Sequence, residues 1–355
     1  MKTEHLNINS NAREMTVLAD NSINLVITSP PYPMIKLWDD LFIKEDPEIK
    51  TLLDSKHFTE AFERMHCQLD QVWQEIFRVV QDGSHVCINI GDALRSGANG
   101  FQVFANSARI ITFMQNIGFQ HLPSIIWRKP TNAPNKFMGS GMLPCGAYVT
   151  LEHENILLFR KGSKRIFSDE ESRHNRLASA LFWEERNNWF SDLWNITGAR
   201  QVGDCALITR RTAAFPPAIP YRLINMYSVY SDTVMDPFHG TGTTMLMAMA
   251  AARNSVGFEQ DKSCWQTAAK RIEIEQNSLN GYSKQRLEQH TKYVKEREEK
   301  GVNCKYENKH YGFPVVTRQE VDLIFKKTDR ITETHPGKYI VQHSNMECYN
   351  NSNDY

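Results

Sequence analysis

VITSPPY, at residues 26–32, is the stretch that decides the fold. The β-branched residues, together with INL before them, predict a short buried strand over residues 23–28. Pro30 and Pro31 end that strand, because each proline lacks a backbone N–H donor and fixes its own φ angle. A stiff loop therefore follows the carboxyl end of a strand. Ligands of open α/β sheets bind outside such ends, so the stretch also predicts a binding site.

Strands and helices alternate on the carboxyl side of this stretch. Apolar residues at helical spacing predict a helix over residues 58–80, and HVCINIG at 85–91 predicts a buried strand. The later predicted elements are a helix at 102–117, strands near 124–127 and at 153–159, a helix at 220–230, a strand at 233–236, a helix at 243–253, a strand at 255–259 and a helix at 261–277. This alternation predicts a doubly wound, mostly parallel α/β sheet.

Two parts of the chain do not follow the alternation. Residues 161–207 are crowded with Arg, Trp, Phe and Asn without a clear period, and they predict an insertion with its own small fold; a loop rich in Pro, Gly and Asn precedes it at 129–148. Residues 279–355 are polar and charge-rich, which predicts an extension with a frayed end, although YGFPVV at 311–316 indicates packing on the core. The expected parts are 1–160, 161–207, 208–278 and 279–355.

Composition excludes several classes of protein. The 355 residues include 41 Lys and Arg against 41 Asp and Glu, so no global positive field attracts nucleic acid and only a local basic surface could do so. No apolar run approaches the roughly 20 residues of a membrane span, and the N-terminus lacks the layout of a secretory signal, so we expect a cytoplasmic protein. The seven cysteines form no CxxC pair, so we expect reduced thiols and no metal site.

A second unusual stretch, DPFHGTGTT at 236–244, lies between a predicted strand and a predicted helix. Its glycines let the backbone approach a ligand, and the helix N-terminus offers N–H groups to an anion. Thr243 stands where a P-loop has Lys, and Met245 stands where a dinucleotide fold has its third glycine. Glu259 ends the next strand, 23 residues past Asp236, where an acidic side chain accepts hydrogen bonds from ribose hydroxyls. These features predict a ligand that contains a nucleoside.

If the strands ending at Thr28 and Asp236 are neighbours, both loops face each other at one edge of the sheet. TSPPY, DPFHGTGTT and VGFE then resemble motifs of the amino-methylating DNA methyltransferases, in the order of their permuted beta class. The resemblance covers most of residues 8–278 and includes SNAREM, RVVQDGSHVCINIGD, EHENILLFRKG and AAFPPAIPYRLI. It implies a circularly permuted, seven-stranded methyltransferase sheet. Residues 1–160 would be its catalytic half, 161–207 its target-recognition insertion and 208–278 its cofactor-binding half.

The resemblance implies S-adenosyl-L-methionine as the cofactor and no metal. Asn11 stands where the family usually has Asp, which keeps an acceptor and removes a charge. The implied cofactor-binding residues are Asn11, Ala12, Thr28, Phe215, Asp236, Pro237, Phe238, Gly240, Gly242, Thr243 and Glu259.

The resemblance also implies catalytic roles for Ser29, Pro30, Pro31 and Tyr32. The exocyclic amino nitrogen of a base is a poor nucleophile, so the Ser29 hydroxyl and the Pro30 carbonyl would accept hydrogen bonds from it, with Pro31 fixing the carbonyl. Tyr32 would stack on a base flipped out of the duplex. In the family, Ser rather than Asp at position 29 goes mostly with cytosine N4, and adenine N6 is the alternative.

A local basic excess indicates where DNA is bound. Residues 128–211 hold 13 Lys and Arg against nine Asp and Glu, which suits phosphate contacts. The candidate DNA contacts are Arg128, Lys129, Lys161, Arg165, Arg173 and Arg176.

The expected partners are double-stranded DNA and a cognate restriction endonuclease acting on the same site. The protein would work in the prokaryotic cytoplasm as a monomer or homodimer, with no membrane partner. Two other interpretations stay open: an RNA or protein amino-group methyltransferase, and a non-enzymatic nucleotide-binding module.

Overall fold

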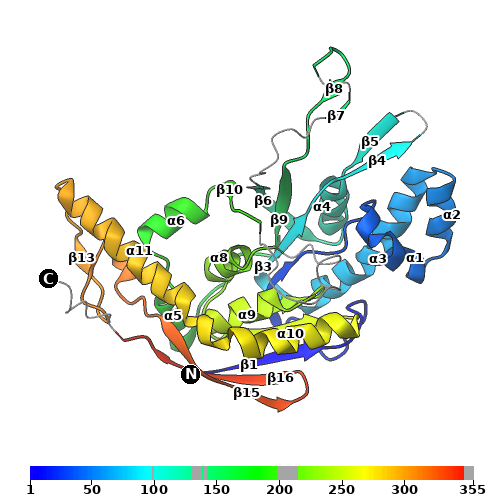
Figure 1. Cartoon of the computed structure of the whole chain (residues 1–355). Coiled ribbons are helices and arrows are strands. Elements are labelled where there is room, and N and C mark those ends of the chain that lie inside the picture. Colours follow the sequence, from blue (N-terminus) through cyan, green and yellow to red (C-terminus); the bar gives the residue numbers. More distant parts are fainter. Residues whose placement is uncertain (98–99, 130–137, 140–141, 199–214, 348–355) are drawn as a thin grey trace.

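A computed structural model describes residues 1–97, 100–129, 138–139, 142–198 and 215–347. A ten-stranded sheet runs through the middle of the molecule (Figure 1). In sheet order its strands are β10 (Leu193–Asn195), β6 (Phe119–Arg128), β9 (His153–Lys161), β3 (Val80–Ile90), β2 (Ile23–Thr28), β11 (Thr233–Asp236), β12 (Asn254–Phe258), β1 (Lys2–Ile8), β16 (Lys338–Asn345) and β15 (Lys326–His335).

The strands from β3 through β2, β11 and β12 to β1 pair in parallel, which confirms the predicted sheet type. The expected seven strands correspond to β6 through β1. The sheet is larger because β10 extends one edge and the β15–β16 hairpin extends the other. Sequence reasoning missed β1 because its inward positions are Thr3, His5 and Asn7, so no apolar alternation marks it.

Both faces of the sheet are covered, because successive residues of a strand point to opposite sides. In β2, Val26 packs in one core with α3 (Phe58–Val79) and α4 (Asn106–Asn116). Leu25 and Ile27 pack in the other core with α8 (Ala218–Tyr227) and α9 (Thr243–Ala250). The helix α10 (Lys262–Glu275) packs near β1. None of the helices in the described ranges combines the length and apolar character needed to cross a membrane.

Several elements were not expected between β2 and β9. The chain after TSPPY forms η1 (Lys36–Trp38), α1 (Asp39–Glu45) and α2 (Glu48–Asp54). The helix expected from residue 102 begins at Asn106, because β4 (Ala93–Gly97) and β5 (Gly100–Phe104) form a hairpin before it. Within the expected loop at 129–148, the described residues include a second hairpin, β7 (Met138–Gly139) and β8 (Ala147–Tyr148); residues 130–137 and 140–141 lie outside the described ranges. Both hairpins project from the sheet (Figure 1).

The insertion and the extension form one body rather than two. Within the described part of 161–207, α5 (Glu170–Ala178) and α6 (Trp183–Trp189) pack against the extension. The extension folds into η2 (Gln276–Ser278, at its boundary), α11 (Asn280–Glu299), β13 (Tyr306–Glu307), β14 (Pro314–Val315) and η3 (Arg318–Glu320) before β15. Phe182 shares a buried cluster with Leu287 and Phe325, so the described part of the insertion and the extension contribute to one core.

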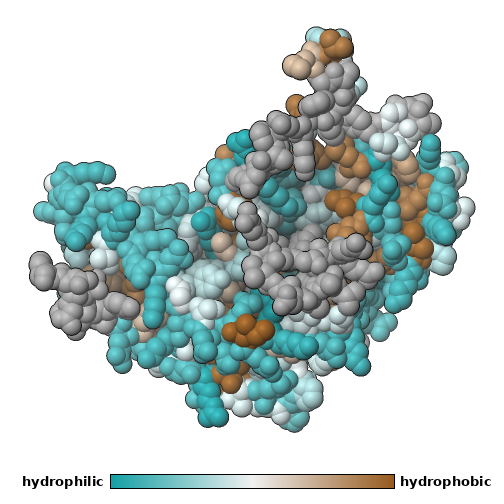
Figure 2. Space-filling view, in the orientation of Figure 1, coloured by the Kyte–Doolittle hydropathy of each residue, from teal (hydrophilic) through white to brown (hydrophobic). Residues whose placement is uncertain are grey.

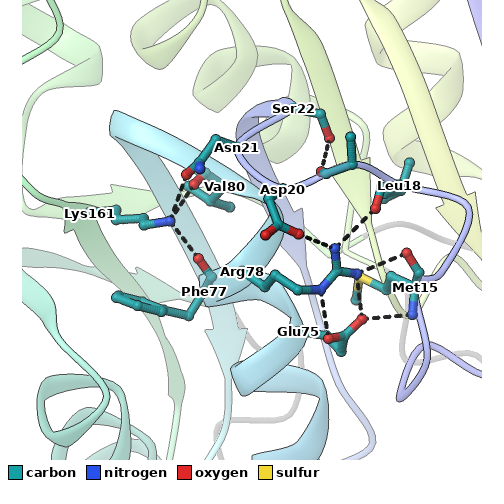
Figure 3. A network of polar contacts seen from close by, with 11 residues as sticks. Met15, Leu18, Asp20, Asn21, Ser22, Glu75, Phe77, Arg78, Val80 and Lys161 are labelled. Carbon is teal, nitrogen blue, oxygen red and sulfur yellow. Dashed lines mark hydrogen bonds and ion pairs between the residues drawn. The ribbon is translucent and has the colours of Figure 1, made fainter.

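A network around Arg78 holds the chain that follows β1 (Figure 3). The Arg78 guanidinium donates to the backbone oxygens of Met15 and Leu18 and to the carboxylates of Asp20 and Glu75. Glu75 in turn accepts from the Met15 backbone N–H. The segment after Ile8 is therefore fixed against α3, beside the cavity described next.

Candidate active site

The two unusual loops of the sequence meet at one edge of the sheet. β2 and β11 are adjacent and parallel, with Leu25 opposite Val234 and Val26 opposite Met235. Beyond these pairs, the Thr28 hydroxyl donates to Asp236 Oδ1 over 2.7 Å. The expectation that the strands ending at Thr28 and Asp236 are neighbours is confirmed.

Both loops line a single cavity of about 450 Å³, within the range of small-molecule sites. The face seen in Figure 2 is hollowed, and apolar residues gather on the wall of the hollow on the α1–α3 side. The expected residues that line the cavity are Asn11, Ala12, Ser29, Pro30, Pro31, Phe215, Asp236, Pro237, Phe238, Gly240, Thr243 and Glu259. Thr28, Tyr32 and Gly242 lie behind this wall.

Asp236 fixes the glycine loop from beneath. One carboxylate oxygen accepts from Thr28 and from the Phe238 backbone N–H, and the other accepts from the Thr244 hydroxyl at 2.7 Å. Burial raises the pKa of Asp236 to about 6, and these hydrogen bonds act in the opposite direction. Gly240 and Gly242 follow with φ angles of 54° and 85°, which only glycine adopts readily.

Glu259 reaches across from the end of β12 to the same loop. Its oxygens accept from the backbone N–H groups of Gly240, at 2.8 Å, and Asp261, at 2.7 Å. Burial raises the pKa of Glu259 to about 7. A carboxylate has about four acceptor positions, so these two bonds leave capacity for hydroxyl groups of a ligand in the cavity.

His239 also lines the cavity, and sequence reasoning assigned it no role. The ring packs against Gly257, where a β-carbon would lie 2.2 Å from Nδ1. Within the described residues neither ring nitrogen has a hydrogen-bond partner, although the side chain is buried. Burial lowers the pKa of His239 to about 4, so the ring is neutral at pH 7. Both ring nitrogens are covered, with Nδ1 facing Gly257 and Nε2 facing Gly242, so the ring fills the space behind the glycine loop.

The TSPPY loop carries a hydrogen-bond network at the inner end of the cavity. Ser29 Oγ and the Tyr32 hydroxyl lie 3.0 Å apart, and Tyr32 donates to Glu154 Oε2 over 3.0 Å. Asn89 Nδ2 lies 2.9 Å from the Tyr32 oxygen and 2.7 Å from Glu154 Oε2.

Asn89 and Glu154 were not among the expected site residues. Both belong to segments that were recognised only as resembling the family, and β3 and β9 bring them together, with Asn89 opposite Ile156. Asn89 is a polar residue inside the apolar run VCINI that ends β3, and this is the signal that could have found it.

The ring of Tyr32 is only 3% exposed. It packs against Gly91, where a β-carbon would lie 3.1 Å from the ring. Burial, followed by the charge of Glu154, raises the pKa of Tyr32 above its ordinary value. The expected stacking on a base therefore requires the atoms that cover the ring to move, and it stays a prediction about a DNA complex.

Asn106 anchors the loop that follows Tyr32. Its amide donates to the backbone oxygens of Pro33, at 3.1 Å, and Gly91, at 3.0 Å, and its oxygen lies 3.0 Å from His66 Nε2. Burial lowers the pKa of His66 to about 3, so this ring is neutral and serves the loop as a hydrogen-bond donor.

Two of the expected DNA contacts lie at the same edge of the sheet as the cavity. Arg128 ends β6 opposite His153, and its side chain is 59% exposed, 3.7 Å from Glu152. Lys129 bonds to Glu154 and lies over the Trp127 ring.

Lys161 and Arg165 lie at the opposite edge of the sheet, where β9 ends. Lys161 Nζ donates to Asn21 and to the backbone oxygens of Phe77 and Val80 (Figure 3). Arg165 pairs with the buried carboxylate of Asp232 at 2.7 and 2.8 Å. Both cations are used inside the fold, so we leave them out of the proposed DNA surface.

Arg173 and Arg176 are exposed on α5, which packs at this same far edge. The Ser179 hydroxyl at the end of α5 accepts from the backbone of Tyr230, just before β11 begins. These two residues are therefore also removed from the cavity, and we leave them out of the DNA surface.

Comparison with known proteins gives consistent matches. Residues 23–270 match the sequence family described as DNA methylase, N6_N4_Mtase. The Type II methyltransferase M.MthZI of Methanothermobacter thermautotrophicus is 47% identical over 325 residues, 91% of this chain and 90% of that protein. M.MjaI of Methanocaldococcus jannaschii is 45% identical over 292 residues, 78% of this chain and 94% of that protein.

Solved structures share the fold. A candidate DNA modification methylase from Thermus thermophilus, complexed with S-adenosyl-L-methionine, is 29% identical with a TM-score of 0.59, over 76% of this chain and 93% of that one. The cytosine-N4-specific PvuII DNA methyltransferase is 18% identical with a TM-score of 0.50, over 76% and 88% of the two chains, which is a likeness of fold alone.

Proposed function

The chain belongs to the DNA methylase family, and from that premise we propose that it methylates the exocyclic N4 amino group of cytosine in double-stranded DNA. It is a Type II DNA methyltransferase of the N4/N6 amino-methylating class, and S-adenosyl-L-methionine is its cofactor. The observation that carries the proposal is the single cavity lined by both Ser29 and Glu259.

We propose that the glycine loop and Glu259 hold the nucleoside end of the cofactor. The acceptor capacity of Glu259 would meet the ribose hydroxyls, and Asn11 and Ala12 would border the adenine. Asp236 would act through the loop, because its carboxylate is occupied by Thr28, Thr244 and the Phe238 backbone N–H. Thr28 and Gly242 would likewise support the site from behind.

When bound, the cofactor would supply a methyl group attached to a positively charged sulfur. A nucleophile that attacks the methyl carbon in line displaces the sulfur. Ser29 and the Pro30 carbonyl would accept hydrogen bonds from the amino group of the base, so that the nitrogen lone pair localises toward the methyl group. Pro31 would keep the carbonyl fixed, and acceptors placed beforehand need no rearrangement during reaction.

The neutral Ser29 hydroxyl supports cytosine over adenine. In the family that the chain resembles, SPPY goes mostly with cytosine N4 and DPPY with adenine N6. Adenine N6 remains the second candidate, since both bases present an amino group of similar geometry to the same acceptors.

We propose that DNA lies across the mouth of the cavity, with the exposed Arg128 among its phosphate contacts and Lys129 kept at Glu154. A flipped base is needed, because a stacked base cannot reach the bottom of a cavity. A restriction endonuclease of the same sequence specificity is a proposed partner, in line with the Type II relatives.

The test is to incubate the purified protein with S-adenosyl-L-methionine and unmethylated genomic DNA, digest to nucleosides and separate them by mass-resolved chromatography. N4-methylcytosine is the expected product. N6-methyladenine would overturn the interpretation of Ser29, and no modified base despite cofactor binding would favour an RNA or protein substrate.

A further inference from the structure

Resting on the proposed function, we propose that Glu154 is the terminal proton acceptor of a relay that runs from Ser29 through Tyr32. The relay does two things. It turns the Ser29 hydroxyl into a hydrogen-bond acceptor toward the base, and it removes the proton that the methylated amino group must lose.

The direction of the hydrogen bonds follows from the chemistry of the three groups. An ionised carboxylate can only accept, so the single proton of the Tyr32 hydroxyl is donated to Glu154. The Tyr32 oxygen then has only acceptor capacity left for Ser29, 3.0 Å away. The Ser29 proton is therefore directed away from the cavity. Asn89 Nδ2 faces one Ser29 lone pair from 3.5 Å, and the remaining lone pair is available to an amino hydrogen of a base.

Asn89 and Lys129 hold the relay in this direction. Asn89 Nδ2 donates to the Tyr32 oxygen and to Glu154 Oε2. These two bonds oppose the reverse arrangement, in which Tyr32 would donate to Ser29. Lys129 Nζ bonds to Glu154 Oε1, the carboxylate oxygen that does not face Tyr32. Tyr32 itself stays protonated, because burial and the nearby carboxylate raise its pKa.

The proton transfer balances without any further reactant. After methyl transfer the amino nitrogen carries a positive charge, and one N–H bond breaks with its electron pair remaining on nitrogen. Ser29 Oγ takes that proton while its own proton moves to the Tyr32 oxygen, and the Tyr32 proton moves to Glu154 Oε2. Ser29 and Tyr32 end as they began, and Glu154 gains one proton. The Glu154 side chain is 13% exposed, so it can return the proton to water.

A purely structural role for the network predicts a different behaviour on substitution. If Glu154 served only to hold the Tyr32 ring, then Tyr32→Phe, which keeps the ring, would keep the rate. If protons pass along a relay, the loss of either Tyr32 or Glu154 stops the transfer. The double variant should therefore lose no more of the methylation rate than either single variant.

The experiment measures single-turnover methylation of a duplex substrate by wild type, Glu154→Gln, Tyr32→Phe and the double variant. Each single variant is expected to lose about 100-fold or more in rate, as for other general acid–base groups, and the double variant is expected to match them. The half-saturating DNA concentration, the calorimetric affinity for S-adenosyl-L-methionine and the thermal midpoint should stay near their wild-type values.

Glu63→Gln is the matched control. Glu63 is a half-exposed carboxylate on α3 that pairs with Arg109, outside the site, and its variant should keep the wild-type rate. A Glu154→Gln rate within about threefold of wild type, or single losses that multiply in the double variant, would overturn the relay. A wild-type protein that methylates no DNA would instead overturn the proposed function, and with it the relay.

Discussion

Carboxylates withdrawn from bulk solvent occur both in the body shared by insertion and extension and at the cavity, but their hydrogen bonds are satisfied differently. In the body shared by insertion and extension, Glu185 and Arg286 pair at 2.5 and 2.7 Å, and Arg286 also bonds Asn225. At the cavity, Glu259 keeps acceptor capacity beyond its two backbone bonds, and Glu154 accepts from a hydroxyl that in turn faces Ser29. An ion pair enclosed in a core builds structure, whereas a partly exposed carboxylate beside a cavity is available for chemistry.

The largest expected effect tests the structural side of this comparison. Glu185→Ala leaves the Arg286 guanidinium buried without its carboxylate, which should lower the free energy of unfolding by about 3–5 kcal/mol. Denaturant unfolding followed by circular dichroism measures this, and the methylation rate below the transition should stay close to wild type.

The Glu185→Leu, Arg286→Met double variant provides the control, because removing both charges should restore much of the stability. A loss below about 1 kcal/mol for Glu185→Ala would mean that the pair is a surface-like contact and that the comparison is wrong.

Ser29→Ala tests the catalytic side. This substitution removes a preorganised hydrogen-bond acceptor, the Ser29 hydroxyl, from the amino group of the base. Single-turnover methylation should slow about 10²–10³-fold. The free energy of unfolding should hardly change, since Ser29 is only half-buried. If the free energy of unfolding fell by as much as the rate loss represents in free energy, Ser29 would belong with the structural residues.

Glu259 should control cofactor affinity with a defined pH dependence. Its pKa of about 7 means that raising the pH from 6.5 to 8.5 ionises it, and the ionised form accepts ribose hydroxyls better. Calorimetry should show affinity rising with pH in the wild type relative to Glu259→Gln, which carries no titrating group there. Asp236, with a pKa of about 6, titrates mostly below this range. If the cofactor affinities of wild type and Glu259→Gln changed with pH in the same way, the assignment of Glu259 to the ribose hydroxyls would be contradicted.

The smallest expected effect compares two exposed arginines. Arg128→Gln, at the cavity edge, should weaken DNA binding and reduce the slope of log affinity against log salt by about one. Arg173→Gln, on α5 at the far edge, should change neither. Fluorescence anisotropy with a labelled duplex over a salt series measures both, and an effect at Arg173 instead would move the DNA surface to α5.

The sequence predicted the cavity edge well because its signals are local. INLVIT and TVMD are short apolar runs that end at loop residues, and the strands lie within a residue of their expected bounds. The contact between Tyr32 and Glu154 could not be predicted, since it joins residues 122 positions apart through the pairing of β2 with β3 and of β3 with β9.

At the far edge the sequence lacks two kinds of information that the structure supplies. A count of charges in the sequence does not distinguish surface cations from cations that bond within the fold. Lys161 and Arg165 are of the second kind, because they donate to acceptors inside the fold. The extension looked polar because its apolar residues are widely spaced, and they form cores only with other parts of the chain: some pack against Phe182 of the insertion, and Tyr339 and Val341 pack in the core of the sheet.

The most direct measurement is a crystal structure of the protein with demethylated cofactor and a duplex containing its target. We expect an extrahelical cytosine in the cavity, with its amino nitrogen within hydrogen-bond distance of Ser29 Oγ and the Pro30 oxygen. We expect the DNA to contact Arg128 but not α5. A duplex lying along α5, or an amino group that does not reach Ser29, would contradict these expectations.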